Sequence, residues 1–511
     1  MHQSISRRSV LKRTVATAAA LGLSGLSARA YSQVVGSNED IHIGVIGFNG
    51  RGVSHIDAWK KMKGVRLVAL CDADEKVLNK GYDHAMKPAS PTTRPSTQPA
   101  AAEVSTAATQ PEKPVYAIEK YHDLRKLLDN KHLDAISTAT PNHWHSLITV
   151  WGCQAGKDVY VEKPVSHNVW EGRKSVEAAR KYNRIVQTGT QNRSNPAITE
   201  AFKWVHEGNL GKVLIARGLC YKRRGSIGKV EAAPPVPASI DLDLWCGPSP
   251  KEAPHRKQFH YDWHWFWATG CGDIGNQGIH EMDKSRWALG KNMLAPKVMS
   301  IGGRFGYDDD GQTPNTQFAV HDYGDSLLIF EVRGLALEPG SQKMDNYKGE
   351  SIGQVIECEN GYLSGTVAYD SDGKEIRNFN GKSEEHFEGD HFANFIHAVR
   401  SRKVADLHAD ILEGHLSSAL CHTSNISYRL GQKADQGEIK EAIKSDKAAM
   451  ETFERFQAHL AKNEVDITME KATLGPVLTM DPKTERFVDN AEANALLSRA
   501  YRKPFVVPEM V

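Results

Sequence analysis

A lysine directly follows a short apolar segment in the run VYVEKPVSHN, residues 159–168. The apolar residues predict a buried strand, and a charge at the end of such a strand loses hydration. Pro164 restricts the backbone of Lys163 to an extended shape, which fixes the direction of its side chain. A desolvated ammonium held in one place can stabilise a developing negative charge and exchange a proton near neutral pH. We therefore predict that the Lys163 side chain is directed into a site where such chemistry could take place; the alternative is an ion pair between Lys163 and Glu162.

A histidine close to several glycines is the second candidate for proton transfer. His280 lies in the run GNQGIHEMD, residues 275–283, and a neutral imidazole can accept the proton of a hydroxyl group. The alternative is a histidine buried in the core. Upstream, residues 261–267 read YDWHWFW. Aromatic faces mixed with His and Asp suit the C–H faces and the hydroxyl groups of a polyhydroxylated ligand.

Residues 47–52 read GFNGRG, which matches the pattern G-x-G-x-x-G except that Asn49 takes the middle glycine position. In that pattern the first glycine allows a tight turn and the last lets helix and strand pack closely, so that a pyrophosphate meets the helix N-terminus. Asp72 ends the next predicted strand, where a carboxylate accepts hydrogen bonds from a ribose and repels a 2′-phosphate. NAD is therefore the predicted cofactor, ahead of NADP. A turn that serves packing alone is the alternative.

Another polar cluster follows a predicted strand in the run TPNHWH, residues 140–145. Parallel sheets bind ligands at the carboxyl ends of their strands, so this cluster and Lys163 are expected beside the nicotinamide ring. His143 and His145 are only two residues apart, and no carboxylate stands nearby at the spacing of metal ligands. We therefore predict no metal site.

In this order, residues 47–52, TPNHWH, EKP and the pattern GxxGIHxxD resemble the Gfo/Idh/MocA family of glucose-fructose oxidoreductases and inositol dehydrogenases. The similarity spans roughly residues 40–430, and the run GHLSSALCHTSNISYRLG resembles an exported branch of that family. The resemblance implies that Lys163 is the catalytic lysine, often joined to its proline by a cis peptide. It also implies that His280 takes the hydroxyl proton during oxidation.

The chain departs from the family at Asn276, where the dehydrogenases usually have aspartate. Asparagine cannot act as a base, so either Lys163 and His280 suffice or the chemistry differs from simple alcohol oxidation. Asp273 is a candidate to restore the carboxylate. The predicted catalytic residues are Lys163, His280 and Asn276. The predicted substrate contacts are Arg193, Trp263, His264 and Asp273. The predicted cofactor contacts are Gly47, Phe48, Asn49, Gly50, Arg51, Gly52, Asp72, Thr140, Pro141, Asn142, His145, Glu162 and Gln191.

The resemblance implies an exported NAD(P)-dependent oxidoreductase that acts on a secondary alcohol of a sugar, a cyclitol or a glycoside. One alternative is an NAD-dependent glycoside hydrolase, which oxidises the sugar, eliminates the glycosidic bond and reduces the product back. Another is a sugar-binding module without catalysis. Members of the family often pair through the second domain, which implies a homo-oligomer, a dimer or a tetramer.

The pattern of predicted elements indicates an α/β chain with several parts. Alternating strands and helices in residues 39–195 predict a Rossmann dinucleotide-binding domain with a parallel sheet, interrupted by a disordered Pro/Thr/Ala-rich insertion at residues 87–114. Longer strands with fewer helices predict an α+β substrate and oligomerisation domain at residues 196–434, with a large, mostly antiparallel, open-faced sheet. Residues 435–511 form a C-terminal extension.

The first thirty residues have the order of an export signal. Arg7 and Arg8 precede the apolar run VATAAALGLSGL, and Ala28 and Ala30 stand at a cleavage-like site. Residues 1–30 therefore predict a twin-arginine signal peptide and a periplasmic or extracytoplasmic location, with no membrane span in the mature chain.

Lys and Arg number 64 against 62 Asp and Glu, a net charge of +2 that gives no reason to expect nucleic acid as a partner. The seven scattered cysteines are read as buried apolar residues.

Overall fold

The computed structural model describes residues 40–87, 117–381 and 387–511. The predicted signal peptide and nearly all of the predicted insertion lie outside the described residues. All seven cysteines lie within them and are buried free thiols. In the described part of the chain, no helix combines the length and the apolar composition needed to cross a membrane.

The first domain is built on six parallel strands in the order β3-β2-β1-β4-β5-β6, which confirms the predicted Rossmann fold. The strands are β1 (Ile41–Ile46), β2 (Val65–Cys71), β3 (Glu119–Tyr121), β4 (Ala135–Thr138), β5 (Asp158–Val161) and β6 (Val186–Thr188). The helices between them are α3 (Gly52–Lys61), α4 (Glu75–Met86), α5 (Leu124–Leu128), α6 (His145–Gln154) and α7 (Val169–Lys181). Strands β4 and β5 are buried throughout, as expected for a parallel sheet covered on both faces.

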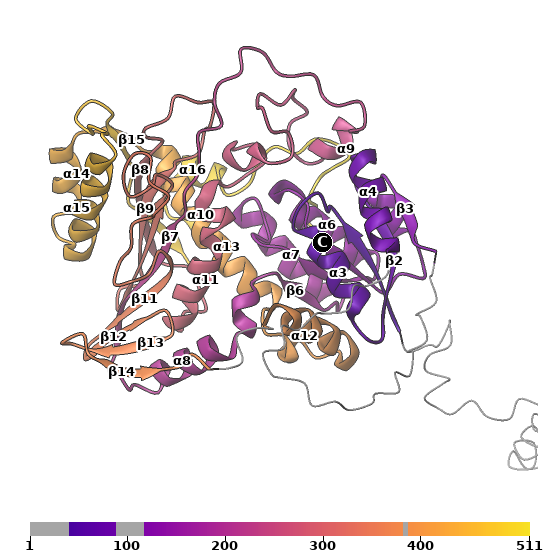
Figure 1. Cartoon of the computed structure of the whole chain (residues 1–511), viewed down its shortest axis with the longest axis horizontal. Coiled ribbons are helices and arrows are strands. Elements are labelled where there is room, and N and C mark those ends of the chain that lie inside the picture. Colours follow the sequence, from indigo (N-terminus) through magenta and orange to yellow (C-terminus); the bar gives the residue numbers. More distant parts are fainter. Residues whose placement is uncertain (1–39, 88–116, 382–386) are drawn as a thin grey trace, which may run out of the picture.

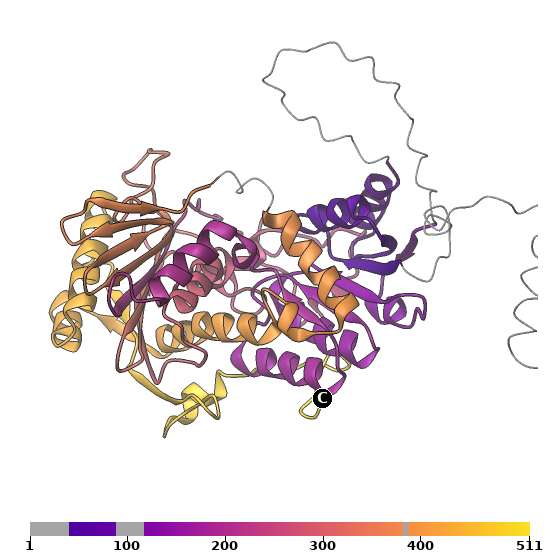
Figure 2. The same cartoon turned by 90° about the horizontal axis from the view of Figure 1, so that it is seen from below.

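A helix from late in the chain completes one face of this domain. Helix α12 (Phe387–Ser401) packs Phe392 and Phe395 into the same core as Trp59 of α3. Figure 2 shows α12 in orange against the indigo and purple first domain. The Rossmann domain therefore includes residues beyond its predicted limit at 195.

The second domain contains a twelve-stranded sheet in which β7 and β10 pair in parallel and the other neighbouring strands pair antiparallel. This confirms the predicted, mostly antiparallel sheet. Its strands are β7 (Val213–Tyr221), β8 (Lys297–Gly303), β9 (Thr316–Asp322), β10 (Leu327–Arg333), β11 (Ile352–Cys358), β12 (Gly361–Ser364), β13 (Val367–Asp370), β14 (Glu375–Asn378), β15 (Gln432–Ala434), β16 (Ala472–Leu474), β17 (Leu478–Asp481) and β18 (Arg486–Phe487).

Side chains alternate across this sheet, so each strand serves two cores. Along β10, Phe330 packs with α11 (Gly278–Ala288) and α13 (Ile411–Leu430), whereas Ile329 packs with α14 (Gln436–Ile443) and α15 (Lys447–Lys462). Figure 1 shows α14 and α15 on the opposite side of the sheet from α11 and α13. The C-terminal extension therefore covers part of the outer face of the sheet. The remaining helices are α8 (Pro196–His206), α9 (Leu242–Cys246), α10 (Gly272–Asn276) and α16 (Ala491–Ala495).

The end of the extension returns to the first domain. Phe505 is 1% exposed and its ring lies 5.4 Å from that of Trp144 and 6.4 Å from that of Trp151. In Figure 1 this yellow segment ends beside α6. Phe505 and Val507 of the run KPFVVP are thus part of the core of the Rossmann domain.

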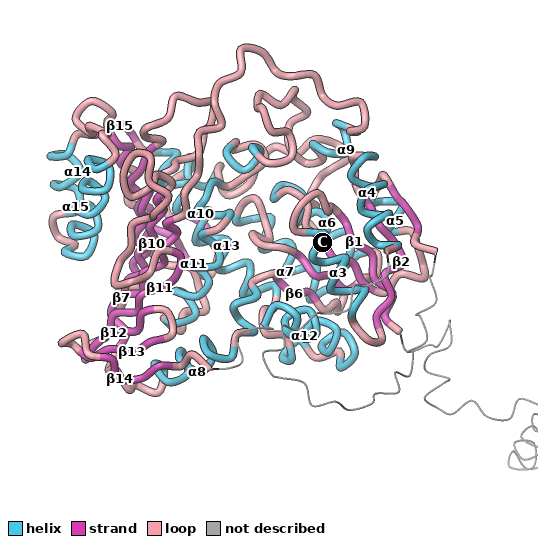
Figure 3. Tube along the Cα trace, in the orientation of Figure 1, coloured by secondary structure: helices cyan, strands magenta, loops and turns pink. Residues whose placement is uncertain are grey.

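A long connection, residues 222–271, passes from β7 across to the first domain before the chain enters α10; we term it the crossing segment (Figure 3). Its backbone is tied to α4 and the end of β2, because Glu75 N donates to Ser239 O at 2.8 Å and Asp241 N donates to Ala73 O at 2.9 Å. The Trp144 indole also donates to Leu244 O at 3.0 Å. These bonds hold the segment over the carboxyl ends of the Rossmann strands.

Candidate functional site

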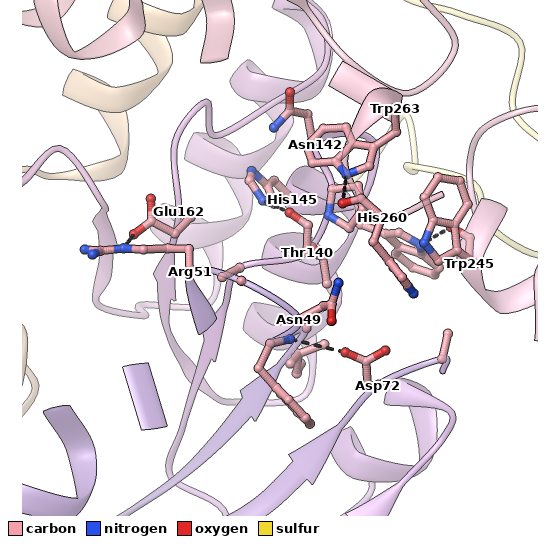
Figure 4. A pocket seen from close by; sticks show the side chains of 18 of the residues that line it. Asn49, Arg51, Asp72, Thr140, Asn142, His145, Glu162, Trp245, His260 and Trp263 are labelled. Carbon is pink, nitrogen blue, oxygen red and sulfur yellow. Dashed lines mark hydrogen bonds and ion pairs between the residues drawn. The ribbon is translucent and has the colours of Figure 1, made fainter. Parts of the chain in front are cut away.

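A cavity of about 660 Å³ lies between the carboxyl ends of the Rossmann strands and the crossing segment (Figure 4). This volume is typical of small-molecule sites. Most of the predicted site residues line it: residues 47–51, Asp72, residues 140–142, His145, Glu162, Lys163, Trp263, His264 and Asn276. Five predicted residues are not part of the lining, namely Gly52, Gln191, Arg193, Asp273 and His280.

The glycine turn has the geometry that its sequence predicts. Gly47 has φ +74°, and a Cβ on Gly47 would lie 2.6 Å from the Thr140 side chain. Gly52 begins α3 beneath the turn, where a Cβ would lie 2.1 Å from Gly47 O. Both glycines are therefore required for the close approach of β1, α3 and the loop after β4, and the N-terminus of α3 faces the cavity side of the turn.

Asp72 is bonded to the glycine turn itself. Its carboxylate accepts from Phe48 N at 3.2 Å and from Asp74 N at 3.0 Å, and it lines the cavity (Figure 4). Burial raises the pKa of Asp72 to about 6, against the opposing effect of these two backbone donors. The pairing of turn and carboxylate fits the phosphate and ribose ends of a dinucleotide.

Lys163 does not pair with Glu162, so the alternative interpretation of an ion pair is wrong. Glu162 accepts instead from Arg51 Nε at 3.0 Å and from Gln191 Nε2 at 3.0 Å, and His55 Nε2 lies 3.2 Å away. Figure 4 shows the Arg51 side chain directed to Glu162. The pKa of Glu162 is well below its ordinary value because hydrogen bonding from His55 and the charge of Arg51 outweigh the effect of burial.

The ammonium of Lys163 donates to the backbone carbonyl of Asn276 at 3.0 Å, which links the end of β5 to α10. The peptide between Lys163 and Pro164 is cis. Burial lowers the pKa of Lys163, and Glu162 acts in the opposite direction. Lys163 therefore lines the cavity with its ammonium fixed by Asn276 O and its pKa lowered.

His280 lies on the first turn of α11, one turn after Asn276. Its Nδ1 is buried without a hydrogen-bond partner. Burial lowers its pKa to about 3, and the charge of Lys163 adds to this effect. His280 is thus a neutral imidazole close enough to sense Lys163, with one ring nitrogen free of protein partners.

Three of the predicted residues have structural partners instead. Asp273 accepts from Arg224 Nε and a terminal Arg224 nitrogen at 2.9 and 2.8 Å, so it does not supply the carboxylate missing at Asn276. Arg193 forms a buried ion pair with Asp283 at 2.8 Å. Gln191 donates through Nε2 to the Glu162 carboxylate and so orients it.

His145 joins the two loops that carry the polar clusters. Its Nδ1 is 2.6 Å from Pro164 O and its Nε2 is 2.7 Å from Thr140 O. Burial lowers its pKa, against the effect of these two carbonyl acceptors, and a neutral imidazole can donate to only one of them. His145 therefore positions the loops after β4 and β5 rather than exchanging protons. No group of three or more potential metal ligands is found in the described ranges.

The crossing segment forms one wall of the cavity, and Trp263 and His264 are the residues of this wall that the sequence predicted. Trp263 and His264 stack with ring centroids 3.6 Å apart and line the cavity. His260 and Trp245 line it too, and His260 Nε2 lies 2.9 Å from Asp74 Oδ2, close to the predicted ribose carboxylate (Figure 4). Aromatic density was the only signal, because the segment has neither helical nor strand periodicity.

Two family models match the chain. Residues 83–190 match the NAD-binding Rossmann fold of the Gfo/Idh/MocA oxidoreductase family, and residues 198–328 match the C-terminal alpha/beta domain of that family. Among curated relatives, a glycosyl hydrolase family 109 protein of Shewanella baltica is 27% identical over 188 residues, 34% of this chain and 36% of that protein. A levoglucosan dehydrogenase of Pseudarthrobacter phenanthrenivorans is 31% identical over 96 residues, 19% of this chain and 25% of that protein. The matches thus span between a quarter and about a third of these relatives.

Solved structures share the fold over most of their length. The WlbA dehydrogenase from Bordetella pertussis, in complex with NADH and UDP-GlcNAcA, has a TM-score of 0.51 at 18% identity and covers 75% of this chain and 94% of its own. A levoglucosan dehydrogenase in complex with NADH and levoglucosan has a TM-score of 0.52 at 15% identity, covering 75% and 95%. A myo-inositol 2-dehydrogenase from Lactobacillus plantarum has a TM-score of 0.51 at 16% identity, covering 76% and 96%.

Proposed function

We propose that this chain, which belongs to the Gfo/Idh/MocA oxidoreductase family, is an NAD-dependent oxidoreductase of a sugar, a cyclitol or a glycoside. The observation that carries the proposal is that the glycine turn, Asp72 and Lys163 all line one cavity. The structural neighbours include dehydrogenases of levoglucosan and of myo-inositol, which supports a polyhydroxylated substrate.

The site residues fall into two groups, those that would hold the cofactor and those that would transfer a proton. The N-terminus of α3 and the turn would hold the pyrophosphate, and Asp72 would hold the ribose. The bound nicotinamide supplies the hydride acceptor. Lys163 would stabilise the alkoxide that forms on the substrate, and the lowered pKa of its ammonium favours its exchange of the hydroxyl proton. His280 is the second proposed acceptor; it lies one turn after Asn276, outside the cavity lining, and its buried Nδ1 has no protein partner.

Replacing Lys163 tests the proposal. K163M keeps the length of the side chain and removes the amine, so we expect turnover to fall by about 10²–10⁴-fold, the usual size of an acid–base contribution. NAD binding, measured by calorimetry, should persist. The matched control is K203M, an exposed lysine of α8, which should leave turnover unchanged. Full activity in K163M would remove the proposed role.

A second candidate is a glycoside hydrolase that oxidises, eliminates and then reduces. The similarity to glycosyl hydrolase family 109 proteins favours it, and Asn276 removes the carboxylate expected of a simple dehydrogenase. An assay with free sugars and aryl glycosides separates the functions. A dehydrogenase accumulates NADH, a hydrolase releases the aglycone without NADH, and a sugar-binding module without catalysis does neither.

We also propose export by the twin-arginine route, on the strength of Arg7, Arg8 and the apolar run after them. Cell fractionation of the full chain and of an R7K/R8K variant tests this, since only the former should leave the cytoplasm.

The proposed homo-oligomer must use surface other than the part of the sheet covered by α14 and α15. Light scattering after size-exclusion chromatography measures the number of subunits.

A further inference from the structure

One turn before His280 the chain has the uncharged Asn276, and the carboxylate of Asp273 on the same helix is committed to Arg224. The next carboxyl along the same helix pair is Glu281, which directly follows His280 on α11. Glu281 is 2% exposed although it carries an ionisable group. A buried acid so close to the proposed proton-transfer residues needs a physical account.

Glu281 is incompletely partnered within the protein. Its Oε1 lies 3.8 Å from Lys284 Nζ, and its carboxyl also accepts from the side chain of Gln277. Its Oε2 is buried without any hydrogen-bond partner. Buried carboxylates whose role is structural normally have both oxygens bonded, as those of Asp283 are, to Arg193 and Ser417.

The charged surroundings connect Glu281 to Lys163. Gln277, which contacts Glu281, also accepts from Lys222 at 2.7 Å, and it is adjacent to Asn276, whose carbonyl holds the Lys163 ammonium at 3.0 Å. The titratable groups that bear on this cluster are Lys163, Cys220, Lys222, Asp273, His280, Lys284, Glu350 and Cys421.

Burial shifts the pKa values of the two groups toward each other, and each group affects the charge of the other. Burial raises the pKa of Glu281 to about 7, against the charge of Lys284. Burial lowers the pKa of Lys163, whereas Glu162 and, more weakly, Glu281 raise it. A change in the charge of one therefore changes the proton affinity of the other.

We propose that Glu281 is a positioning residue that acts through Lys163: its carboxylate stabilises the ammonium form of the lysine and replaces the charge absent at Asn276. This inference rests on the proposed function. It assigns Glu281 a role that depends on its ionised form, which a buried acid held permanently neutral for packing would not have.

The test measures Lys163 directly, by the pH dependence of its trace reductive methylation, quantified by mass spectrometry on the full chain. E281Q keeps the size of the side chain and removes the charge. We expect the apparent pKa of Lys163 to fall by about one unit, the lower end of the effect of one nearby opposite charge. The acidic limb of the pH–rate profile should move to lower pH by the same amount.

Two further variants make the result decisive. E350Q removes a carboxyl that faces Lys284 but not Lys163, and it should leave the labelling curve unchanged. K284M, which disfavours the ionised form of Glu281, should shift the curve in the same direction as E281Q and serves if E281Q does not fold. Unchanged labelling in both E281Q and K284M would overturn the proposal. Because labelling needs neither cofactor nor turnover, it stays informative even if no dehydrogenase activity is found.

Discussion

Replacing Phe505 with alanine should destabilise the Rossmann domain, although Phe505 lies far along the chain from the strands of that domain. Its ring is 1% exposed, packs edge-on to Trp144, and lies 4.8 Å from the Arg502 guanidinium. A fully buried Phe→Ala change costs about 3–5 kcal/mol, and the aromatic contact accounts for about 0.5–1.5 kcal/mol of that. We therefore expect F505A to lose about 3–5 kcal/mol of unfolding free energy, a large share of the ~5–15 kcal/mol of a typical domain.

The same variant should weaken NAD binding, because Trp144 lines the cavity and its indole holds the carbonyls of Leu244 and Trp245. Urea unfolding followed by circular dichroism gives the stability, and calorimetry gives the affinity. The matched control is M510A, five residues on and 90% exposed, which should stay within about 0.5 kcal/mol of wild type. An F505A protein within about 1 kcal/mol of wild type would refute the assignment of this segment to the core.

Three other outcomes follow from the geometry. G52A should abolish NAD binding and lower the melting temperature, because its Cβ would lie 2.1 Å from Gly47 O, whereas G50A, whose Cβ meets nothing within 4 Å, should fold normally. D72S should raise NADP affinity relative to NAD by about tenfold (~1.4 kcal/mol), as titrations with both dinucleotides would show, because the carboxylate that repels the 2′-phosphate is gone. Burial lowers the pKa of His321 from 6.5 to about 3. The free energy of unfolding should therefore fall as the pH drops from 6.5 toward 3, by up to about 1.4 kcal/mol per pH unit. H321N should reduce this pH dependence in urea unfolding measured across the same range.

The parts of the site that the sequence predicts are those fixed by local backbone geometry. A glycine turn between strand and helix, and a lysine before proline at a strand end, require residues that are neighbours in the chain. Parallel pairing then brings the ends of β1, β2, β4 and β5 to one edge, so the contents of the cavity follow from the strand order. This is why residues 47–51, Asp72 and Lys163 gather as expected.

The parts that escape prediction depend on partners far apart in the chain. Asp273 is bonded to Arg224, 49 residues before it, and Arg193 to Asp283, 90 residues after it. Nothing in the local pattern shows that these charges are already paired. Phe505 stands in a short apolar run with no periodicity, so its burial against Trp144 also has no sequence signal.

The location of α12 and Phe505 has a consequence for biosynthesis. The first strand of the Rossmann sheet begins at Ile41, yet its two hydrophobic cores close only with residues 392–411 and 505–511. During translation the nascent nucleotide domain therefore keeps apolar surface uncovered until more than five hundred residues have left the ribosome. Pulse proteolysis of stalled chains should therefore find this domain digestible until residues 505–511 have emerged from the ribosome, and resistant after that.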